Sequence, residues 1–389
     1  MNINHSKVLF IVANANCLGG TEIVAFNLLQ ELNNIGISCR LLSIIPYKGD
    51  NPLVISFTNR EYQLWSRKNK LLLNKLLGDQ LSDSILQNLI VNKAKEICAD
   101  WIVNHTYDFV AAIPTNSTLS TAQVFNWSIK GYEESITQII SRKGGLTKFF
   151  STISFNLIKR RWHQAFTRFN KLILLTDAAR EEIKEVSPSV QLSQLITIPN
   201  PLMRDADSLQ VSTLQTNNLV FVGRLSHEKG VMRLLRIWEY VHIRLPQCTL
   251  NIYGDGDAKR EMLEYIIHHN LPRIQFKGFN TNIEQIYTQS DLLMLTSETE
   301  GFGMVIIEAM YYGVPCISFD CPVSPKEIIR DAGVIIPCFD EMQYADEVIR
   351  LMTNQPRLQN LQQKCIIRAR DFFKSKVIKT WKELIISSR

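Results

Sequence analysis

Short hydrophobic runs separated by helix-length segments recur along the chain. In the first half they cover residues 7–15, 37–45, 101–104, 123–127 and 171–176. Runs of this length, bounded by polar residues or glycine, are typical of buried strands. The first run leads through Gly19 and Gly20 into a predicted helix that Thr21 caps and Gly36 ends. This alternation predicts an α/β fold with parallel strands.

The second half repeats the pattern six times. Its hydrophobic runs cover residues 219–222, 249–253, 274–277, 292–296, 315–319 and 334–336. Six such strands make a complete parallel sheet, whose ligands are expected beyond the carboxyl ends of the strands. A boundary is predicted near Pro199 and Pro201, since two prolines fix φ and remove two hydrogen-bond donors.

The length of 389 residues is too great for one ordinary core and suits two domains. We therefore predict two Rossmann-like domains, residues 1–200 and 201–373, whose parallel sheets face each other across a cleft. The amphipathic segment 374–389, which contains Trp381, is expected to be a helix that can pack back on the first domain.

Composition agrees with a globular protein, with 46% hydrophobic and 21% charged residues. The first hydrophobic run is too short to span a membrane. A lipoprotein signal ending at Cys17 is disfavoured because Asn14 and Asn16 replace the small residues that cleavage needs. The eight cysteines are scattered, without C-x-x-C pairs or zinc spacing, which favours a cytoplasmic protein with reduced thiols.

Two carboxylates eight residues apart form the strongest local signal. Glu300 lies in a glycine-bounded loop after a strand, and Glu308 lies about five residues into a helix predicted to begin near Gly303. Backbone N–H groups at a helix start favour anions, and carboxylates accept hydrogen bonds from sugar or ribose hydroxyls. Taken alone, the pair is more often a loop with two solvated glutamates.

Two cations follow an earlier strand of the same predicted sheet. Arg224 and Lys229 precede a helix predicted from Val231, and a guanidinium and an ammonium beside a helix start suit a diphosphate. An ordinary surface loop is the alternative. Asp255 and Asp257 form a D-G-D string after the next strand, which we interpret as a turn and not as a metal site.

Together these segments resemble the retaining glycosyltransferases of family 4, which have the GT-B fold. The motifs are G-R-L-x-x-E-K-G, Y-G-D-G, K-G-F and S-E-T-E-G-F-G-M-V-I-I-E-A-M-Y-Y-G-V-P, in this order within residues 219–338. The loop Gly19-Gly20-Thr21-Glu22 is similar to that family's opening loop, and between residues 50 and 170 the resemblance fades.

The resemblance implies roles for these residues. Arg224 and Lys229 would bind the donor diphosphate and stabilise the leaving group, Glu308 would hold the ribose hydroxyls, and Glu300 would hold the donor sugar. The other implied donor contacts are backbone N–H groups of Phe302, Gly303 and Met304, the base-bordering Gly278 and Phe279, and Gly19 and Gly20 from the opposite domain.

A metal is not expected, because two fixed cations can offset the charge that builds up on the departing diphosphate. We therefore predict no cofactor, with a UDP- or GDP-linked sugar as substrate. Retention implies that the acceptor attacks from the face the leaving group departs, with Glu300 orienting the sugar. Many relatives carry a histidine after a strand of the first domain; here the candidates are Asn126 and His105.

Residues 142–171 combine eight basic and six aromatic residues and contain no acidic one. Such a stretch suits an anionic bilayer surface or a lipid diphosphate, and the alternative is a solvated helix face with a buried aromatic stripe. Nucleic acid is disfavoured because no known binding fold accompanies the charge.

The expected function is sugar transfer from a nucleotide sugar to a glycan acceptor, lipid-linked and at the inner face of the cytoplasmic membrane, in bacterial surface polysaccharide or lipopolysaccharide synthesis. Two alternatives stand beside it: a GT-B enzyme with a small soluble acceptor, and a non-catalytic subunit that binds the nucleotide sugar. A nicotinamide dehydrogenase is disfavoured because C-L-G-G-T-E replaces G-x-G-x-x-G after the first strand.

Overall fold

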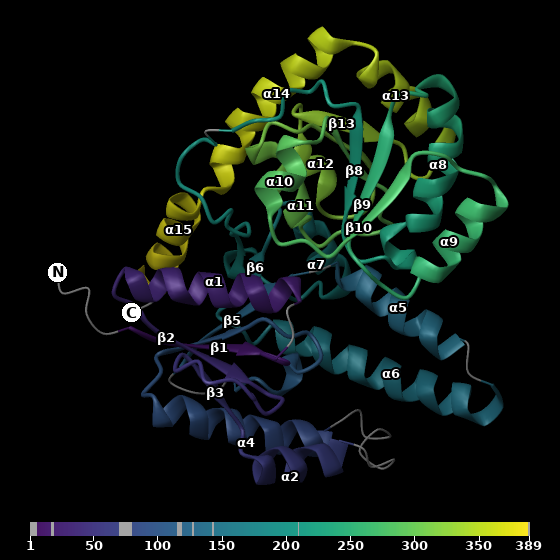
Figure 1. The fold of residues 1–389 in the computed structure, drawn as a ribbon. Helices are drawn as coiled ribbons and strands as arrows, with labels where there is room; N and C mark the ends of the chain where they lie inside the picture. Colours follow the sequence, from purple (N-terminus) through teal and green to yellow (C-terminus); the bar gives the residue numbers. More distant parts are fainter. Residues whose placement is uncertain are drawn as a thin grey trace. The chain divides into compact units, whose positions relative to one another are not determined.

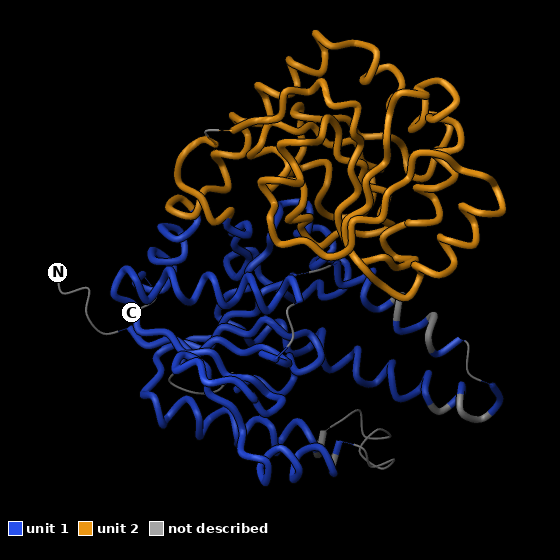
Figure 2. The backbone as a smooth tube through the Cα atoms, viewed as in Figure 1, with its two compact units in different colours: residues 1–201, 377–389 blue, residues 202–376 orange. Residues whose placement is uncertain are grey.

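The computed structural model describes residues 6–16, 19–69, 80–114, 119–126, 128–141, 144–208 and 210–387. Cys17, on which the lipoprotein alternative depends, lies outside them. The chain forms two compact units (Figure 2). Unit 1 comprises Met1–Pro201 and Val377–Arg389, and unit 2 comprises Leu202–Lys376. These divisions lie one and three residues from the boundaries that the sequence indicated.

Unit 1 is built on a seven-stranded parallel sheet with the order β3-β2-β1-β4-β5-β6-β7. The strands are β1 (Lys7–Val12), β2 (Ser38–Ser43), β3 (Val54–Ser56), β4 (Trp101–Asn104), β5 (Ser120–Phe125), β6 (Lys171–Leu174) and β7 (Leu195–Thr197). The five predicted strands are all present. The two edge strands β3 and β7 were missed because three residues are too few to show a hydrophobic period.

Helices cover both faces of this sheet, with α1 on one side and α4 on the other (Figure 1). The α-helices that the structure describes in unit 1 before residue 201 are α1 (Gly20–Asn34), α2 (Asn59–Asn69), α4 (Gln80–Glu96), α5 (Ile129–Ser141), α6 (Gly145–Phe166) and α7 (Ala179–Val186). The prediction that Thr21 caps α1 was wrong. Gly19 occupies the N-cap position, and no side chain caps the helix.

Unit 2 is built on a six-stranded parallel sheet with the order β10-β9-β8-β11-β12-β13. Its strands are β8 (Asn218–Val222), β9 (Thr249–Tyr253), β10 (Ile274–Gly278), β11 (Leu292–Leu295), β12 (Cys316–Phe319) and β13 (Gly333–Ile336), which match the six predicted runs. Strand order reverses between β8 and β11. In open α/β sheets, ligands bind beyond the strand ends at such a switch point.

The helices of unit 2 pack on both faces of its sheet (Figure 1). They are α8 (Val231–Arg244), α9 (Lys259–His268), α10 (Ile283–Thr288), α11 (Met304–Tyr311), α12 (Pro325–Ile329), α13 (Glu341–Met352) and α14 (Gln355–Ala369). Trp238 of α8 is fully buried, and its indole N–H donates to the carbonyl of Pro272 at 2.9 Å. This bond joins α8 to the segment that precedes β10 and gives the buried indole N–H its partner.

The last helix, α15 (Lys374–Ser387), packs in unit 1 from Val377 onward. The ring of Trp381 is 3% exposed and lies 6.3 Å from the ring of Phe10 in β1. The polypeptide therefore leaves unit 1 after Pro201 and returns to it after Lys376. Within the described residues, none of the helices has the length and hydrophobicity needed to span a membrane.

Candidate functional site

Two loops at the switch point of unit 2 carry most of the predicted site residues. The first, residues 223–230, follows β8, and the second, residues 296–303, follows β11, which pairs with β8. The loops are hydrogen-bonded to each other. The amide of Glu298 donates to the carbonyl of Glu228 at 2.9 Å, and the hydroxyl of Thr296 donates to the carbonyl of Lys229 at 3.1 Å.

Lys229 and Glu300 form an ion pair between these two loops. The Lys229 Nζ lies 2.8 Å from Oε1 of Glu300, and the Ser297 hydroxyl donates to the same oxygen at 2.6 Å. Glu300 is only 6% exposed, so the alternative of a solvated loop glutamate was wrong. Both bonds use Oε1, which leaves Oε2 to accept a hydrogen bond from a ligand.

The backbone of Glu300 is held as firmly as its side chain. The hydroxyl of Ser324 donates to the carbonyl of Glu300 at 3.0 Å, and Glu300 forms an isolated parallel bridge with Val323. The segment after β12 therefore supports the loop from a third strand end. Ser297 and Ser324 were missed by sequence reasoning, although Ser297 follows a predicted strand directly.

Gly230 lets the two loops approach closely. Its φ is +65°, and a Cβ at this position would lie 1.9 Å from the carbonyl oxygen of Thr296. A side chain there would meet both a strained backbone and a backbone atom that cannot move aside. This glycine is thus required for the contact between Lys229 and Glu300.

The two predicted cations differ in their surroundings. Arg224 is exposed, and its side chain has no hydrogen-bond or ion-pair partner in the part of the chain that the structure describes. Lys229 shares its charge with Glu300 and is 26% exposed. The loop therefore presents one unpaired guanidinium and one ammonium that is already oriented by a carboxylate.

Helix α11 begins next to these side chains. Gly303 is its N-cap with a φ of +79°, and Met304 is its first residue. Phe302 is buried, with its ring packed edge-on against Phe372 at 5.7 Å. The predicted contact of Phe302 with a ligand is thereby limited to its backbone. The first N–H groups of a helix have no partner within the helix and are available to an anion.

Glu308 lies on the second turn of α11 and is partly buried. Burial raises the pKa of its carboxyl group to about 7, while the charge of Arg204 and a hydrogen bond with Tyr287 oppose the shift. The carboxyl group is therefore poised to change its ionisation near neutral pH. Arg204 and Tyr287 carry no local sequence signal, and only the fold places them beside Glu308.

Gly278 is the last residue of β10, an edge strand of the sheet, and Phe279 follows it. Gly278 has a φ of +69°, and the Phe279 ring is 76% exposed. An exposed aromatic ring at a strand end can stack on a planar group such as a nucleobase.

The D-G-D string after β9 leads into a turn, in which the amide of Lys259 donates to the carbonyl of Gly256 at 3.2 Å. Asp255 accepts a hydrogen bond from the Gly256 amide at 3.0 Å and pairs with Lys259 at 3.3 Å. Among the described residues there is no group of three or more His, Cys, Asp or Glu side chains that could hold a metal ion.

Unit 1 holds the other four predicted residues. Gly19 and Gly20 start α1, and a Cβ added to Gly20 would meet no atom within 4 Å. A Cβ added to Gly19, by contrast, would lie 2.5 Å from Oε2 of Glu22, so of these two glycines only Gly20 has open space beside it among the described atoms.

His105 and Asn126, predicted as alternatives, are neighbours. The Asn126 Nδ2 lies 3.4 Å from Nδ1 of His105 and donates to the His105 carbonyl at 3.3 Å. Burial lowers the pKa of His105 to about 3, so its imidazole is neutral at physiological pH. The Nε2 of His105 and the Oδ1 of Asn126 are both buried without a partner in the described structure. Buried polar atoms usually have a partner, so these two atoms are candidates for hydrogen bonds to a ligand.

The basic and aromatic stretch at 142–171 is largely helix α6. Its residues Arg142 and Lys143 lie outside the described residues. Phe155, Trp162 and Phe166 are buried, which agrees with the alternative of a buried aromatic stripe, and Phe149 is exposed.

Known proteins share this sequence pattern and fold. Residues 209–372 match the family model of glycosyl transferases group 1. The amylovoran biosynthesis glycosyltransferase AmsD of Erwinia amylovora is 32% identical over 170 residues, which cover 43% of this chain and 48% of AmsD. An uncharacterized glycosyltransferase of Haemophilus influenzae is 23% identical over 390 residues, covering 97% of this chain and 99% of its own length. The chain thus spans about half the length of AmsD and nearly all of the second relative.

Solved structures extend the similarity to the whole chain. S. aureus TarM, in complex with fondaparinux, alpha-GlcNAc-glycerol and UDP, has a TM-score of 0.73 at 14% identity and covers 98% of this chain and 100% of its own. Anabaena Alr3699/HepE, in complex with UDP-glucose, has a TM-score of 0.71 at 18% identity. The match covers 99% of this chain and 100% of the HepE chain. The predicted α/β fold of GT-B type, with two Rossmann-like units, is confirmed.

Proposed function

We propose that this chain, whose residues 209–372 match the family model of glycosyl transferases group 1, transfers a sugar from a nucleotide-diphosphate sugar to a glycan acceptor. The observation that carries this proposal is the ion pair between Lys229 and Glu300 at the switch point of unit 2. In this pair, the ammonium of Lys229 is suited to a phosphate, and the neighbouring carboxylate of Glu300 is suited to a sugar hydroxyl. Arg224 and the start of α11 lie on the same two loops.

The reaction breaks the bond between the anomeric carbon of the sugar and a phosphate oxygen. Negative charge then develops on the departing diphosphate, and Arg224, Lys229 and the N–H groups at Gly303 and Met304 stabilise it. These groups perform the task without a metal ion. Glu300 holds the sugar through Oε2, and Glu308 accepts hydrogen bonds from the ribose hydroxyls.

The new bond forms with retention of the anomeric configuration. The acceptor hydroxyl attacks the face from which the diphosphate leaves, and its proton passes to a diphosphate oxygen. A role in binding a sugar is proposed for His105 and Asn126 as well, because neutral imidazole and amide groups suit hydrogen bonds to hydroxyls.

The donor is proposed to be a UDP-linked sugar and the acceptor a lipid-linked glycan at the inner face of the cytoplasmic membrane. UDP is named with several of the similar structures. A Campylobacter jejuni relative, 29% identical over 178 residues, is named as an N-acetylgalactosaminyltransferase acting on a diNAcBac-PP-undecaprenol-linked glycan. Surface polysaccharide synthesis is the corresponding setting.

Purified protein, a panel of labelled UDP- and GDP-sugars and a bacterial lipid extract test the proposal. We expect one donor to raise the unfolding temperature and to label a lipid-extractable product. Glu300→Gln, which keeps the size of the side chain, should lower kcat at least 100-fold and leave the fold unchanged. A chelator should leave the rate unchanged.

Three results would contradict parts of this proposal. Donor binding without turnover on any acceptor would favour the non-catalytic subunit. Transfer to a free sugar with no lipid requirement would remove the lipid-linked acceptor. A rate abolished by the chelator and restored by a divalent ion would refute the metal-independent mechanism.

A further inference from the structure

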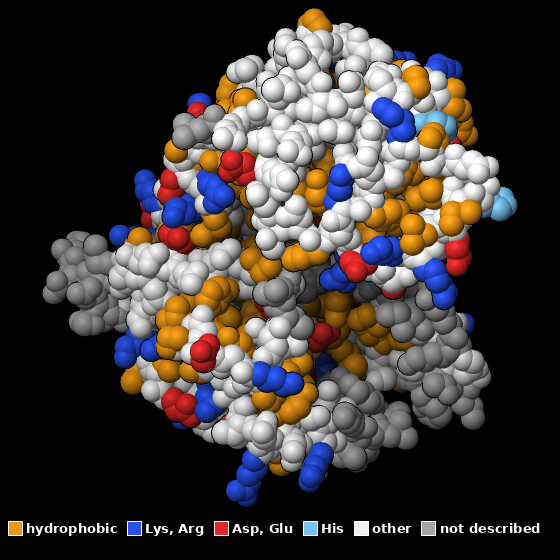
Figure 3. Space-filling model, viewed as in Figure 1, with side chains coloured by type: hydrophobic (Ala, Val, Ile, Leu, Met, Phe, Trp, Pro, Cys, Tyr) orange, Lys and Arg blue, Asp and Glu red, His pale blue; other side chains and the backbone are white. Residues whose placement is uncertain are grey.

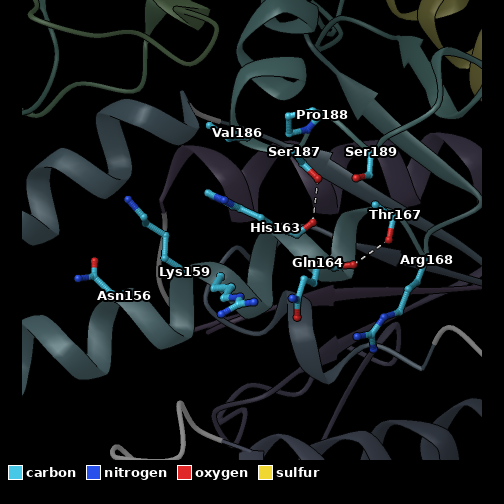
Figure 4. A pocket seen from close by; sticks show the side chains of 11 residues that line it. Asn156, Lys159, His163, Gln164, Thr167, Arg168, Val186, Ser187, Pro188 and Ser189 are labelled. Carbon is cyan, nitrogen blue, oxygen red and sulfur yellow. Dashed lines mark hydrogen bonds between the residues drawn. The ribbon is translucent and has the colours of Figure 1, made fainter.

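A pocket of about 610 Å³ lies in unit 1, between the carboxyl-terminal half of α6 and the segment that follows α7. Figure 4 shows Lys159, His163 and Arg168 on one side and Ser187, Pro188 and Ser189 on the other. Its volume falls in the range of small-molecule sites. The function proposed above makes no use of it.

The charged side chains that line the pocket are all basic. Lys159, Arg160 and Arg168 all line the pocket, and none of its eleven lining residues is Asp or Glu. The carboxylate of Glu133 contacts two of the lining residues: it lies 3.3 Å from Lys159 Nζ and 2.6 Å from His163 Nε2. With one carboxylate against three permanent cations, the pocket keeps a net positive charge.

The two arginines are the lining cations that no carboxylate among the described residues pairs with. Arg160 and Arg168 are exposed, and neither side chain has a hydrogen-bond or ion-pair partner within the described ranges. By contrast, Arg161 on the same helix pairs with Asp83 at 2.7 Å. Arg160 and Arg168 therefore have their full donor capacity directed to solvent or to a ligand.

Helix capping does not account for these arginines. Basic residues often lie at a helix carboxyl end because they complement its dipole. Here the last carbonyls of α6 already have other partners: Ala165 and Phe166 accept from the amides of Arg168 and Phe169, and Thr167 accepts from Gln194.

Two of the neutral polar residues that line the pocket already donate hydrogen bonds to backbone carbonyls. The hydroxyl of Ser187 donates to the carbonyl of His163 and that of Thr167 to the carbonyl of Gln164, each at 2.9 Å (Figure 4). These bonds hold the Ser187 and Thr167 hydroxyls in place, so the charged side chains are the groups available to a ligand. On the face shown in Figure 3, by comparison, lysine and arginine side chains are dispersed among acidic ones.

We propose that this pocket binds a phosphate or diphosphate group, held by Arg160 and Arg168 with Lys159 as a third cation. Guanidinium groups match phosphate oxygens with paired hydrogen bonds, and a hydrated phosphate fits the open volume. The exposed side chains of Phe149, Ile153 and Leu157 recur every four residues on the same helix. They provide an apolar path for a lipid chain attached to the phosphate. The site is independent of the donor site in unit 2.

Hydrogen–deuterium exchange locates such binding by segment, which separates this pocket from the proposed diphosphate site. Inorganic pyrophosphate should slow exchange in residues 156–168 and 186–190. In Arg160→Gln/Arg168→Gln the concentration needed for this protection should rise at least tenfold. Arg244→Gln/Arg260→Gln, which removes two exposed arginines from unit 2, should leave it unchanged. Both double variants should keep the wild-type unfolding temperature because all four side chains are exposed.

Vesicles identify the source of the phosphate. If phosphatidylcholine vesicles containing phosphatidylglycerol protect the same residues and pyrophosphate does so only weakly, the ligand is a lipid headgroup. Protection by pyrophosphate alone identifies a soluble phosphate compound. Protection of residues 223–230 only, equal protection by pure phosphatidylcholine, or equal protection in Arg160→Gln/Arg168→Gln would overturn the proposal.

Discussion

At the scale of single residues, the candidate site depends on side chains that the sequence places far apart. The sequence identifies Lys229 and Glu300 as chemical types, because both follow hydrophobic strands of one predicted sheet. Their pairing at 2.8 Å could not be predicted, since it depends on the register of β8 and β11 and on the loop geometry at Gly230. The influence of Arg204 on Glu308 is likewise visible only in the fold.

Glu308 gives the stability of unit 2 a specific pH dependence. Its pKa is about 7 in the folded protein and close to 4.5 when unfolded. Between these values the folded state keeps a proton that the unfolded state has released, so the free energy of unfolding falls as pH rises from 4.5 to 7. Glu308→Gln should remove this loss and stabilise the protein by on the order of 2 kcal/mol above pH 7.

Urea unfolding of both proteins at pH 5 and pH 8 measures this difference. The stabilisation by Glu308→Gln should be small at pH 5 and full at pH 8. A difference that does not change with pH would show that the carboxyl group titrates normally in the folded state. The same variant should also bind the nucleotide sugar more weakly, because an amide accepts fewer hydrogen bonds than a carboxylate.

At the scale of elements, the candidate site is formed by the loops that follow the carboxyl ends of three strands. β8, β11 and β12 are neighbours in the sheet, and the residues after each of them touch: loop 223–230 bonds loop 296–303, which in turn bonds Val323 and Ser324. The hydrophobic pattern predicted these three strands, so it predicted where ligand groups collect. It did not predict β3 and β7, because a three-residue edge strand has almost no pattern to detect.

Two glycines with similar backbone conformations test the importance of this loop contact. Gly230 and Gly278 have φ values of +65° and +69°, but an added Cβ would lie 1.9 Å from Thr296 O in the first case and within 4 Å of nothing in the second. Gly278→Ala should cost about 1 kcal/mol, the conformational penalty alone. Gly230→Ala should cost several times more, since the two loops must separate.

Chemical denaturation of the two variants gives the comparison. Equal losses of stability would mean that the loops can shift at little cost and that the ion pair is not held by their packing. In Gly230→Ala, we also expect faster exchange of the Glu298 amide, because its bond to the Glu228 carbonyl joins the loops.

At the scale of the whole molecule, the sequence predicts two units of the same architecture, because regularly spaced hydrophobic runs indicate the strands of each sheet. The middle of unit 1 was harder to interpret, since β3, α2 and α4, which the structure describes between residues 50 and 100, have weak periodicity. The contact of Trp381 with Phe10, across more than 370 residues of sequence, follows only from the folded chain.

The last helix is expected to be part of the core of unit 1. Trp381→Ala removes a buried ring from the contact with β1 and should cost roughly 3 kcal/mol. Lys379→Ala, on the exposed side of the same helix, should change stability by less than about 0.5 kcal/mol. Hydrogen exchange resolves the effect by unit: opening should increase in β1 and β4 and stay constant in β8 and β9. A uniform increase would show that the units do not unfold separately.

The return of the chain to unit 1 also sets an order of folding during synthesis. When a ribosome has added Lys376, every residue of unit 2 exists, whereas the helix that covers Phe10 has not yet been made. The domain that starts first is therefore finished last. Until Val377–Ser387 emerge, Phe10 lacks its contact with Trp381, and exposed hydrophobic surface is what chaperones bind.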